Sequence, residues 1–209
     1  LLCLIFGFPV AYYITLQREN RRNFYIYLVT IPVWTNLLIR TFAWIIILGR
    51  GGVIEAPLLA TGIIDDSLRM MYTDGAIAIG LTYSYLPLMV LPIYASLEKL
   101  DFRLLDAASD LYANRLEIMT KVVIPLCKPG IIAGCILVFI PCVGAFIAPN
   151  LLGGGKKLML GSLVQFQFAS ARNWPFGGAL SMLLLSVVVI ALIFYARAAK
   201  NRAALEGSA

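Results

Sequence analysis

The longest polar interval of the chain begins Glu98-Lys99-Leu100-Asp101-Phe102-Arg103-Leu104-Leu105-Asp106-Ala107-Ala108-Ser109-Asp110-Leu111 and ends at Pro129. Its apolar residues recur at helical spacing with charges between them, which predicts an amphipathic helix. Asn114, with Glu117 three residues later, predicts a capping box that starts a second helix. Pro125 and Pro129 are expected to bound that second helix. The interval, here the 98–129 segment, therefore predicts a compact helical knob, although an amphipathic connector lying on a lipid surface has the same pattern.

Composition decides the class of protein. The chain of 209 residues is 61% hydrophobic and 13% charged, and its mean hydropathy is +0.88. A soluble domain of this length could not bury that much apolar surface. The four cysteines form no CxxC pair, so neither a metal site nor a disulfide is indicated. The absence of histidine removes the usual general base and metal ligand.

The apolar runs predict five membrane spans, at residues 1–17, 24–48, 75–97, 130–147 and 176–196. The expected fold is therefore an all-α polytopic transmembrane bundle, with one membrane domain over residues 1–200 and a tail over 201–209. Residues 1–17 have no initiator Met and no charged start, which argues against a signal peptide. We expect this first span to lack its beginning.

The distribution of Lys and Arg predicts the orientation in the membrane. The loops on one side hold eleven such residues: Arg18, Arg21, Arg22, Lys99, Arg103, Arg115, Lys121, Lys128, Arg197, Lys200 and Arg202. The loops on the other side hold five: Arg50, Arg69, Lys156, Lys157 and Arg172. Cytoplasmic loops are the richer in basic residues, so the 98–129 segment and the C-terminus are expected in the cytoplasm. The net charge of +6 is then explained by basic residues that set the membrane topology and contact lipid headgroups, and it does not indicate nucleic-acid binding.

No enzyme is indicated. The sequence has no GxSxG motif and no carboxylate pair inside a predicted span. Gly153-Gly154-Gly155-Lys156-Lys157 looks like a phosphate-binding loop, but it lacks the Ser or Thr after Lys and the first Gly of that motif. If transport is driven by ATP, the ATPase must be another chain.

Asp106-Ala107-Ala108, Tyr112 and Val122-x-Ile124-Pro125 have the spacing of a known loop. They resemble the EAA loop of binding-protein-dependent ABC importer permeases, which reads Glu-Ala-Ala, three residues, Gly, nine residues, Ile, x, Leu, Pro. Residues 31–40, 130–135 and 173–179 are similar to spermidine/putrescine permeases of the PotB type. The resemblance covers residue 1 to about residue 200, beginning inside the family's second span.

The resemblance implies an inner-membrane subunit with the type I importer permease fold. Its partners would be a second permease, a cytoplasmic ATPase dimer that holds ATP and Mg, and a periplasmic binding protein, with no cofactor on this chain. The EAA helices would sit in a cleft of the ATPase. The residues carried over to this role are Asp106, Ala107, Ala108, Tyr112, Asn114, Glu117, Val122, Ile124 and Pro125. Asp replaces Glu at Asp106, and Tyr replaces the hinge Gly at Tyr112, where a positive φ would be strained unless the hinge uses Asn114 instead.

A polyamine needs carboxylates for its ammonium groups and aromatic faces for its methylene chain. No predicted span contains an acidic residue, and Asp74 is the best placed of the outer acids, which also include Glu55, Asp65 and Asp66. The candidate pathway residues are Trp34, Asn36, Asp74, Tyr83, Tyr85 and Tyr94. Aromatic residues near span ends more often form an interfacial belt or pack against neighbours, and missing acids could come from the partner permease. Arg40 is expected to extend toward the outer interface.

The outer loop from Pro149 to Pro175 contains an apolar stretch, Leu160 to Phe168, that is expected to dip into the membrane edge. In the resembling family such loops receive the periplasmic binding protein, and Lys156, Lys157 and Arg172 would pair with its acids. An interfacial helix without a partner is the alternative.

The sequence as a whole predicts a permease subunit that carries spermidine or putrescine across the inner membrane by alternating access. One alternative is the same machine for another substrate, such as iron or an oxyanion. The other is a pore or scaffold protein without an ATPase.

Overall fold

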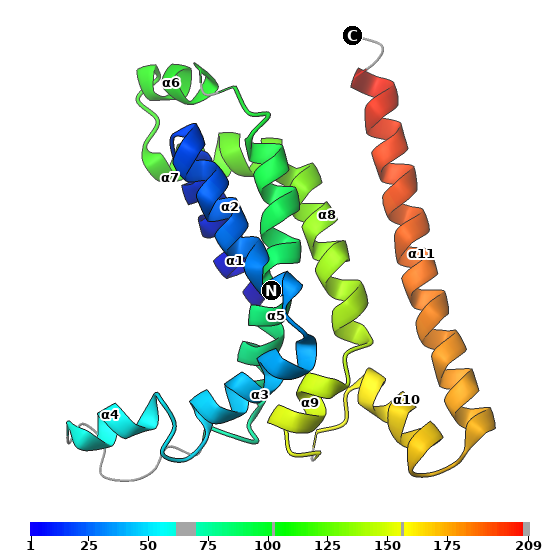
Figure 1. Ribbon diagram of the computed structural model, residues 1–209. Coiled ribbons are helices and arrows are strands. Elements are labelled where there is room, and N and C mark those ends of the chain that lie inside the picture. Colours follow the sequence, from blue (N-terminus) through cyan, green and yellow to red (C-terminus); the bar gives the residue numbers. More distant parts are fainter. Residues whose placement is uncertain (62–69, 102, 156, 207–209) are drawn as a thin grey trace. The chain divides into compact units, whose positions relative to one another are not determined.

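The computed structural model describes residues 1–61, 70–101, 103–155 and 157–206, and every regular element in these ranges is a helix (Figure 1). The all-α fold class is confirmed. In chain order the helices are α1 (Leu2–Thr15), α2 (Glu19–Trp34), α3 (Leu37–Leu48), α4 (Glu55–Ala60), α5 (Asp74–Leu97), α6 (Arg103–Asp110), α7 (Arg115–Ile118), a π-helical turn (Met119–Val123), α8 (Ile124–Val143), α9 (Ile147–Leu152), α10 (Leu160–Ala169) and α11 (Trp174–Glu206).

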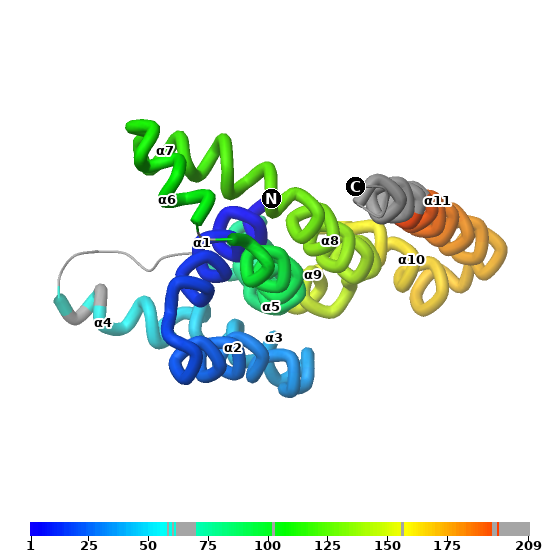
Figure 2. Tube along the Cα trace, turned by 90° about the horizontal axis from the view of Figure 1, so that it is seen from above, coloured from blue at the N-terminus to red at the C-terminus, as the bar shows by residue number. Residues whose placement is uncertain are grey.

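The helices form two compact units. Unit 1 consists of Leu1–Trp34 and Tyr85–Val138, and unit 2 consists of Thr35–Ser84 and Phe139–Ala209. In unit 1, α1 runs alongside the second half of α5 (Figures 1 and 2). The core of unit 1 joins these two helices to the start of α8. Its buried residues are Ala11, Ile14, Met89, Val90, Ile93, Tyr94, Leu97, Val123 and Cys127.

Small residues let the helices of unit 1 approach closely. A Cβ added at Gly7 in α1 would lie 3.1 Å from Met89 Cγ, and one added at Gly134 in α8 would lie 2.8 Å from Met89 Sδ. Close approach through glycine is a common way for membrane helices to gain van der Waals contact, because lipid provides no hydrophobic driving force between them. The start of α2 is joined to the end of α5 by an ion pair between Arg22 and Glu98 at 3.1 Å.

Unit 2 has a core of its own, in which α3, the first turns of α5 and α9 meet. Its buried residues are Leu48, Ala76, Ile77, Ala148 and Leu152. The start of α11 packs on α10, where the rings of Phe168 and Trp174 meet edge to face with centroids 5.9 Å apart. The apolar stretch noted from Leu160 to Phe168 lies in the helix α10.

The spans agree only in part with the prediction. Among the described residues, α5, Arg115–Val143 and Trp174–Ile193 are long and apolar enough to cross a membrane, and the bent pair of α2 and α3 would make a fourth span. The apolar helix α1 is shorter, at 14 residues. The span predicted over residues 24–48 consists of two helices, because the chain leaves the helix after Trp34 and Asn36 caps a new one.

The helix after Asn114 does not stop at the prolines, so that expectation is wrong. Arg115–Val143 is one helical stretch that passes through Pro125 and Pro129. A proline inside a helix removes an N–H and crowds the carbonyl four residues earlier. Here a π-helical turn precedes Pro125, in which the N–H of Ile124 donates to the carbonyl of Met119, five residues back. The wider turn relieves the crowding that the proline causes within the helix.

Two other expectations concern the loop before α5 and the C-terminus. In the loop before α5, Asp65, Asp66 and Arg69, which were assigned to the outer side, fall on residues 62–69, outside the described residues. At the other end, α11 continues to Glu206, so most of the expected tail is helical.

Candidate functional site

The 98–129 segment contains the first candidate site, and its first helix is α6. Asp101 starts this helix: its Oδ1 accepts the N–H of Arg103 at 3.0 Å, and its carbonyl accepts the N–H of Leu104 at 3.1 Å. Asp106 and Ala107 are exposed on α6, whereas Ala108 is half-buried. The amphipathic helix predicted here is confirmed, and it presents the Asp106 carboxylate to solvent.

The turn after α6 confirms the unusual backbone considered at Tyr112. The N–H of Tyr112 donates to the carbonyl of Ser109 at 3.0 Å, and the N–H of Ala113 donates to that of Ala108 at 3.1 Å. This is the Schellman pair of bonds that closes a helix around a left-handed residue, usually Gly. Tyr112 has φ +59, which costs a residue with a Cβ about 1 kcal/mol or more relative to Gly.

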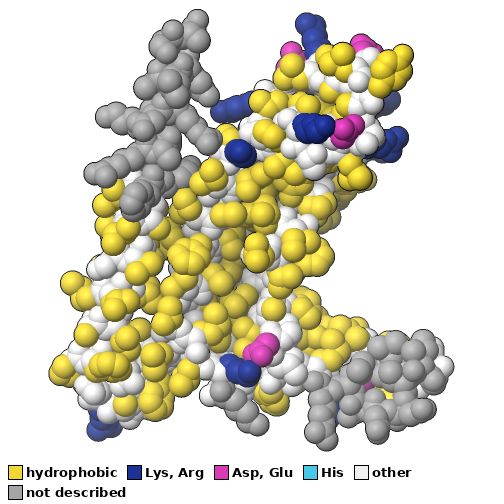
Figure 3. Space-filling model, turned by 180° about the vertical axis from the view of Figure 1, so that it is seen from behind, with side chains coloured by type: hydrophobic (Ala, Val, Ile, Leu, Met, Phe, Trp, Pro, Cys, Tyr) yellow, Lys and Arg dark blue, Asp and Glu magenta, His cyan; other side chains and the backbone are white. Residues whose placement is uncertain are grey.

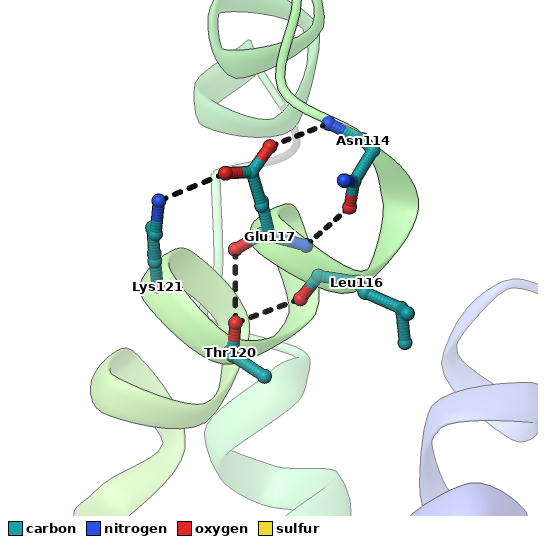
Figure 4. A network of polar contacts seen from close by, with 5 residues as sticks. All are labelled: Asn114, Leu116, Glu117, Thr120 and Lys121. Atoms are coloured by element: carbon teal, nitrogen blue, oxygen red, sulfur yellow. Dashed lines mark hydrogen bonds and ion pairs between the residues drawn. The ribbon is translucent and has the colours of Figure 1, made fainter.

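The second helix begins with the predicted capping box (Figure 4). Asn114 Oδ1 accepts the N–H of Glu117 at 2.9 Å, and Glu117 Oε2 accepts the N–H of Asn114 at 3.1 Å. Lys121 Nζ lies 2.9 Å from Glu117 Oε1. Thr120 Oγ1 donates to the carbonyl of Leu116 at 2.8 Å.

Val122, Ile124 and Pro125 lie where this helix reaches the unit 1 core. Val122 and Ile124 are half-buried and Pro125 is exposed, while Val123 between them is fully buried in the unit 1 core. The capping box is therefore connected to the buried start of α8 by unbroken helix, without a loop. A rigid connection of this kind can pass a displacement along its axis.

The surface of the helix pair combines charge with exposed apolar side chains. Figure 3 shows Lys, Arg, Asp and Glu side chains gathered over the α6–α7 end of unit 1, while apolar side chains cover the helices next to it. Within this charged region Leu111, Tyr112 and Leu116 are 81%, 97% and 76% exposed. Large apolar side chains grouped on an exposed surface are typical of protein interaction sites.

The candidate pathway residues are divided between the units. Trp34, Tyr85 and Tyr94 belong to unit 1, and Asn36, Asp74 and Tyr83 belong to unit 2. Trp34 is 88% exposed at the end of α2, Tyr85 is half-buried, and Tyr94 is 8% exposed within the unit 1 core. Burial in a core favours packing over substrate contact for Tyr94.

In unit 2, three candidates have partners within the unit that the sequence analysis did not predict. Asn36 Oδ1 caps α3 by accepting the N–H of Leu38 at 2.8 Å. The Tyr83 ring meets Trp44 edge to face at 5.5 Å. Asp74, the first residue of α5, forms an ion pair with Lys157 through Oδ2 and Nζ at 3.0 Å. Lys157 was expected to meet acids of a binding protein, and in this chain it meets Asp74.

Arg40, which was expected to extend toward the outer interface, has a hydrogen-bond partner on α5. Its Nη1 donates to the carbonyl of Ser84 on α5 at 3.4 Å, and the side chain is half-buried. Pro87 has no N–H, so the neighbouring Tyr83 carbonyl loses its helical donor and the helix is disturbed at this point.

Unit 2 also contains an open apolar hollow of about 550 Å³. Its lining includes Ile140, Phe146, Val164, Leu184 and the polar Gln165. None of the described residues that line it is charged, so it offers no counter-ion to an ammonium group and is not a candidate polyamine site.

These features describe a helical membrane protein with an exposed pair of short helices, α6 and α7. The family of binding-protein-dependent transport system inner membrane components matches residues 4–202. The chain belongs to this family and is a permease subunit of an ABC importer.

Similar proteins are known in several bacteria. The chain is 43% identical over 200 residues to the spermidine/putrescine transport system permease protein PotB of Escherichia coli K12, covering 96% of this chain and 73% of that protein. It is 42% identical to PotB of Haemophilus influenzae, with 96% and 70% covered. A bacterial alginate ABC transporter, crystallised in complex with an alginate-bound periplasmic protein, contains a chain that matches with TM-score 0.72 at 16% identity, over 93% of this chain and 72% of that one. That structural likeness concerns the fold alone.

Proposed function

We propose that this permease carries polyamines of the spermidine and putrescine type across the inner membrane by alternating access. The observation that supports this substrate class is the identity of 42–43% to PotB proteins over 95–96% of the chain. ATP would be hydrolysed on a separate subunit, because the sequence lacks a nucleotide-binding loop. The partners would be a second permease, an ATPase dimer and a periplasmic binding protein that delivers the polyamine.

The α6–α7 knob is proposed to lie on the cytoplasmic side and to bind the ATPase there. The C-terminus is proposed to lie on the same side. The excess of Lys and Arg in the loops assigned to that side supports this orientation. The coupling role falls on Asp106, Ala107, Ala108, Tyr112, Asn114, Glu117, Val122, Ile124 and Pro125. The unbroken helix from Arg115 to Val143 supports the role, because a push on α7 would reach α8 without an intervening loop.

On the substrate route, Asp74 is proposed as the carboxylate that receives an ammonium group, with Trp34, Asn36, Tyr83 and Tyr85 beside it. Tyr94, buried in the unit 1 core, is left to packing. The aromatic residues would contact the methylene chain and the cationic ends. Asp74 is the member with the right charge, and its position at the first residue of α5, exposed to solvent, suits an entry site.

Uptake into proteoliposomes tests the proposal directly. The full-length permease would be reconstituted with its partner permease, ATPase and binding protein, and uptake of labelled spermidine and putrescine measured with and without internal ATP. We expect ATP-dependent uptake of one polyamine that the other competes away. A different outcome would be no polyamine uptake, but ATPase activity that is stimulated by a binding protein loaded with iron or an oxyanion. That outcome would support an ABC importer and contradict polyamines as its substrate. Solute leakage without ATP would reject the importer mechanism in favour of a pore.

A further inference from the structure

Tyr112 occupies a backbone position that suits glycine. Among the described residues, only Tyr72, Tyr112 and Arg172 combine a side chain with positive φ, at 62, 59 and 50 degrees. Glycine adopts this conformation without the steric penalty of a Cβ. A strained residue persists when its surroundings fix the backbone, and such residues cluster at functional sites. The question at Tyr112 is therefore what the ring does that glycine would not.

The backbone around Tyr112 is fixed on both sides. Two hydrogen bonds close the end of α6 over it, from its own N–H to Ser109 and from Ala113 to Ala108. The capping box of Asn114 and Glu117 starts the next helix two residues later. The ring is thus attached to a short turn between two capped helix ends, and backbone hydrogen bonds set the direction of the Tyr112 Cα–Cβ bond.

The ring contributes little to packing within the chain. Tyr112 is 97% exposed, so the folded chain gains almost no burial from it. Leu111, just before it, is 81% exposed, and Leu116 at the start of the next helix is 76% exposed. Tyr72 is different although its φ is similar: its N–H donates to the carbonyl of Leu152 at 3.0 Å, and its ring lies against Gly154.

We propose that Tyr112 is an aromatic anchor that enters an apolar pocket of the ATPase subunit and selects the ATPase that this permease accepts. The inference rests on the proposed ATPase binding of the α6–α7 knob. Tyr is enriched among the few residues that dominate interface energies, and its ring loses little conformational entropy on binding. Because the two capped helix ends already fix the backbone of the turn, binding has less to order. An ATPase that fits a permease with Gly at this position would lack room for the ring.

Substitutions at Tyr112 separate this role from a structural one. In nanodiscs holding the full-length permease and its partner permease, labelled cognate ATPase would be titrated and its dissociation constant measured, together with the melting temperature without ATPase. For Tyr112→Gly and Tyr112→Asn, which suit positive φ but lack the ring, we expect ATPase binding weaker by about tenfold or more. Their melting temperature should equal or exceed that of the parent, because the strain is relieved. Tyr112→Phe should bind within about threefold of the parent, because the ring is kept.

Tyr72→Gly is the matched control, since it removes a second tyrosine at positive φ, in unit 2. It should leave ATPase binding unchanged. Parent-like binding by Tyr112→Gly, equal weakening by Tyr72→Gly, or weakening accompanied by a lower melting temperature in the Tyr112 variants would each overturn the anchor. If the folded parent itself held no ATPase, the proposed binding role of the knob would fail, and the anchor with it.

Discussion

The first N–H groups of α7 have no carbonyl of a preceding helical turn to bond, and the side chain of Asn114 supplies one acceptor. Its side chain accepts the N–H of Glu117 at 2.9 Å, and loss of such a cap typically costs about 1 kcal/mol. Asn114→Ala should therefore raise amide hydrogen exchange over Arg115–Ile118 by about fivefold. Exchange measured by mass spectrometry on the permease in nanodiscs would report this change.

The controls for that prediction come from the same network. Asn114→Ser keeps an N-cap oxygen and should exchange like the parent. Glu117→Gln keeps the box and loses only the exposed ion pair to Lys121, which is worth about 0–1 kcal/mol. Unchanged exchange in Asn114→Ala would show that the helix start is held by packing and not by its cap.

The contact between α5 and α8 in unit 1 depends on a residue without a side chain. A Cβ added at Gly130 would lie 2.3 Å from Ser96 Oγ and 2.5 Å from the Pro92 carbonyl oxygen. A backbone carbonyl cannot turn aside as a side chain can, so Gly130→Ala should lower stability by about 1–3 kcal/mol. Thermal unfolding in detergent would show a lower melting temperature. Gly178→Ala, where nothing lies within 4 Å, is the control and should be neutral or stabilising; a loss of stability there would contradict the packing argument.

Short-range signals in the sequence predicted the helix pair well. Asn114 and Glu117 are three residues apart, and the box that they form depends only on local backbone geometry. The positive φ of Tyr112 was indicated only by the glycine that the family pattern has at this position, with Asn114 as the alternative. The capping box could be predicted because it is decided within a few residues.

Other features depend on how a helix adjusts to a proline or on residues far away in the sequence, and sequence patterns do not show these. Pro125 was expected to end a helix, yet a π-helical turn absorbs it. The break before Asn36 was hidden inside a long apolar run, although Asn is a strong N-cap residue. Arg40 meets the Ser84 carbonyl 44 residues away, and Lys157 meets Asp74 83 residues away. No local periodicity indicates such pairs.

At the scale of the whole molecule, ATP hydrolysis must reach the substrate through the knob if our proposal is right. Asp106 is exposed on α6 and lies close to the turn at Tyr112. Asp106→Lys reverses its charge without disturbing a core, so the variant should insert normally and hydrolyse ATP while uptake falls by about tenfold or more, a typical loss when a charged interface contact is reversed. Parallel assays of ATPase activity and polyamine uptake in proteoliposomes would measure this uncoupling.

The conservative variant makes the coupling prediction specific. Asp106→Glu keeps the charge and restores the acid of the family pattern, so it should transport like the parent. Normal uptake by Asp106→Lys would remove Asp106 from the coupling role, and failed insertion would show that the charge serves folding.

The ion pair of Asp74 and Lys157 leads to the last prediction, because a lysine side chain ends in the same primary ammonium group as a polyamine. If Asp74 receives substrate, Lys157 competes with it. Asp74→Asn should raise KM for uptake about two- to fivefold, as expected for an exposed pair worth up to about 1 kcal/mol, with an unchanged melting temperature. Lys157→Gln should lower KM or leave it unchanged, because it frees the carboxylate. If both variants raise KM equally, the pair only holds the loop after α9 against α5, and the ammonium site lies elsewhere.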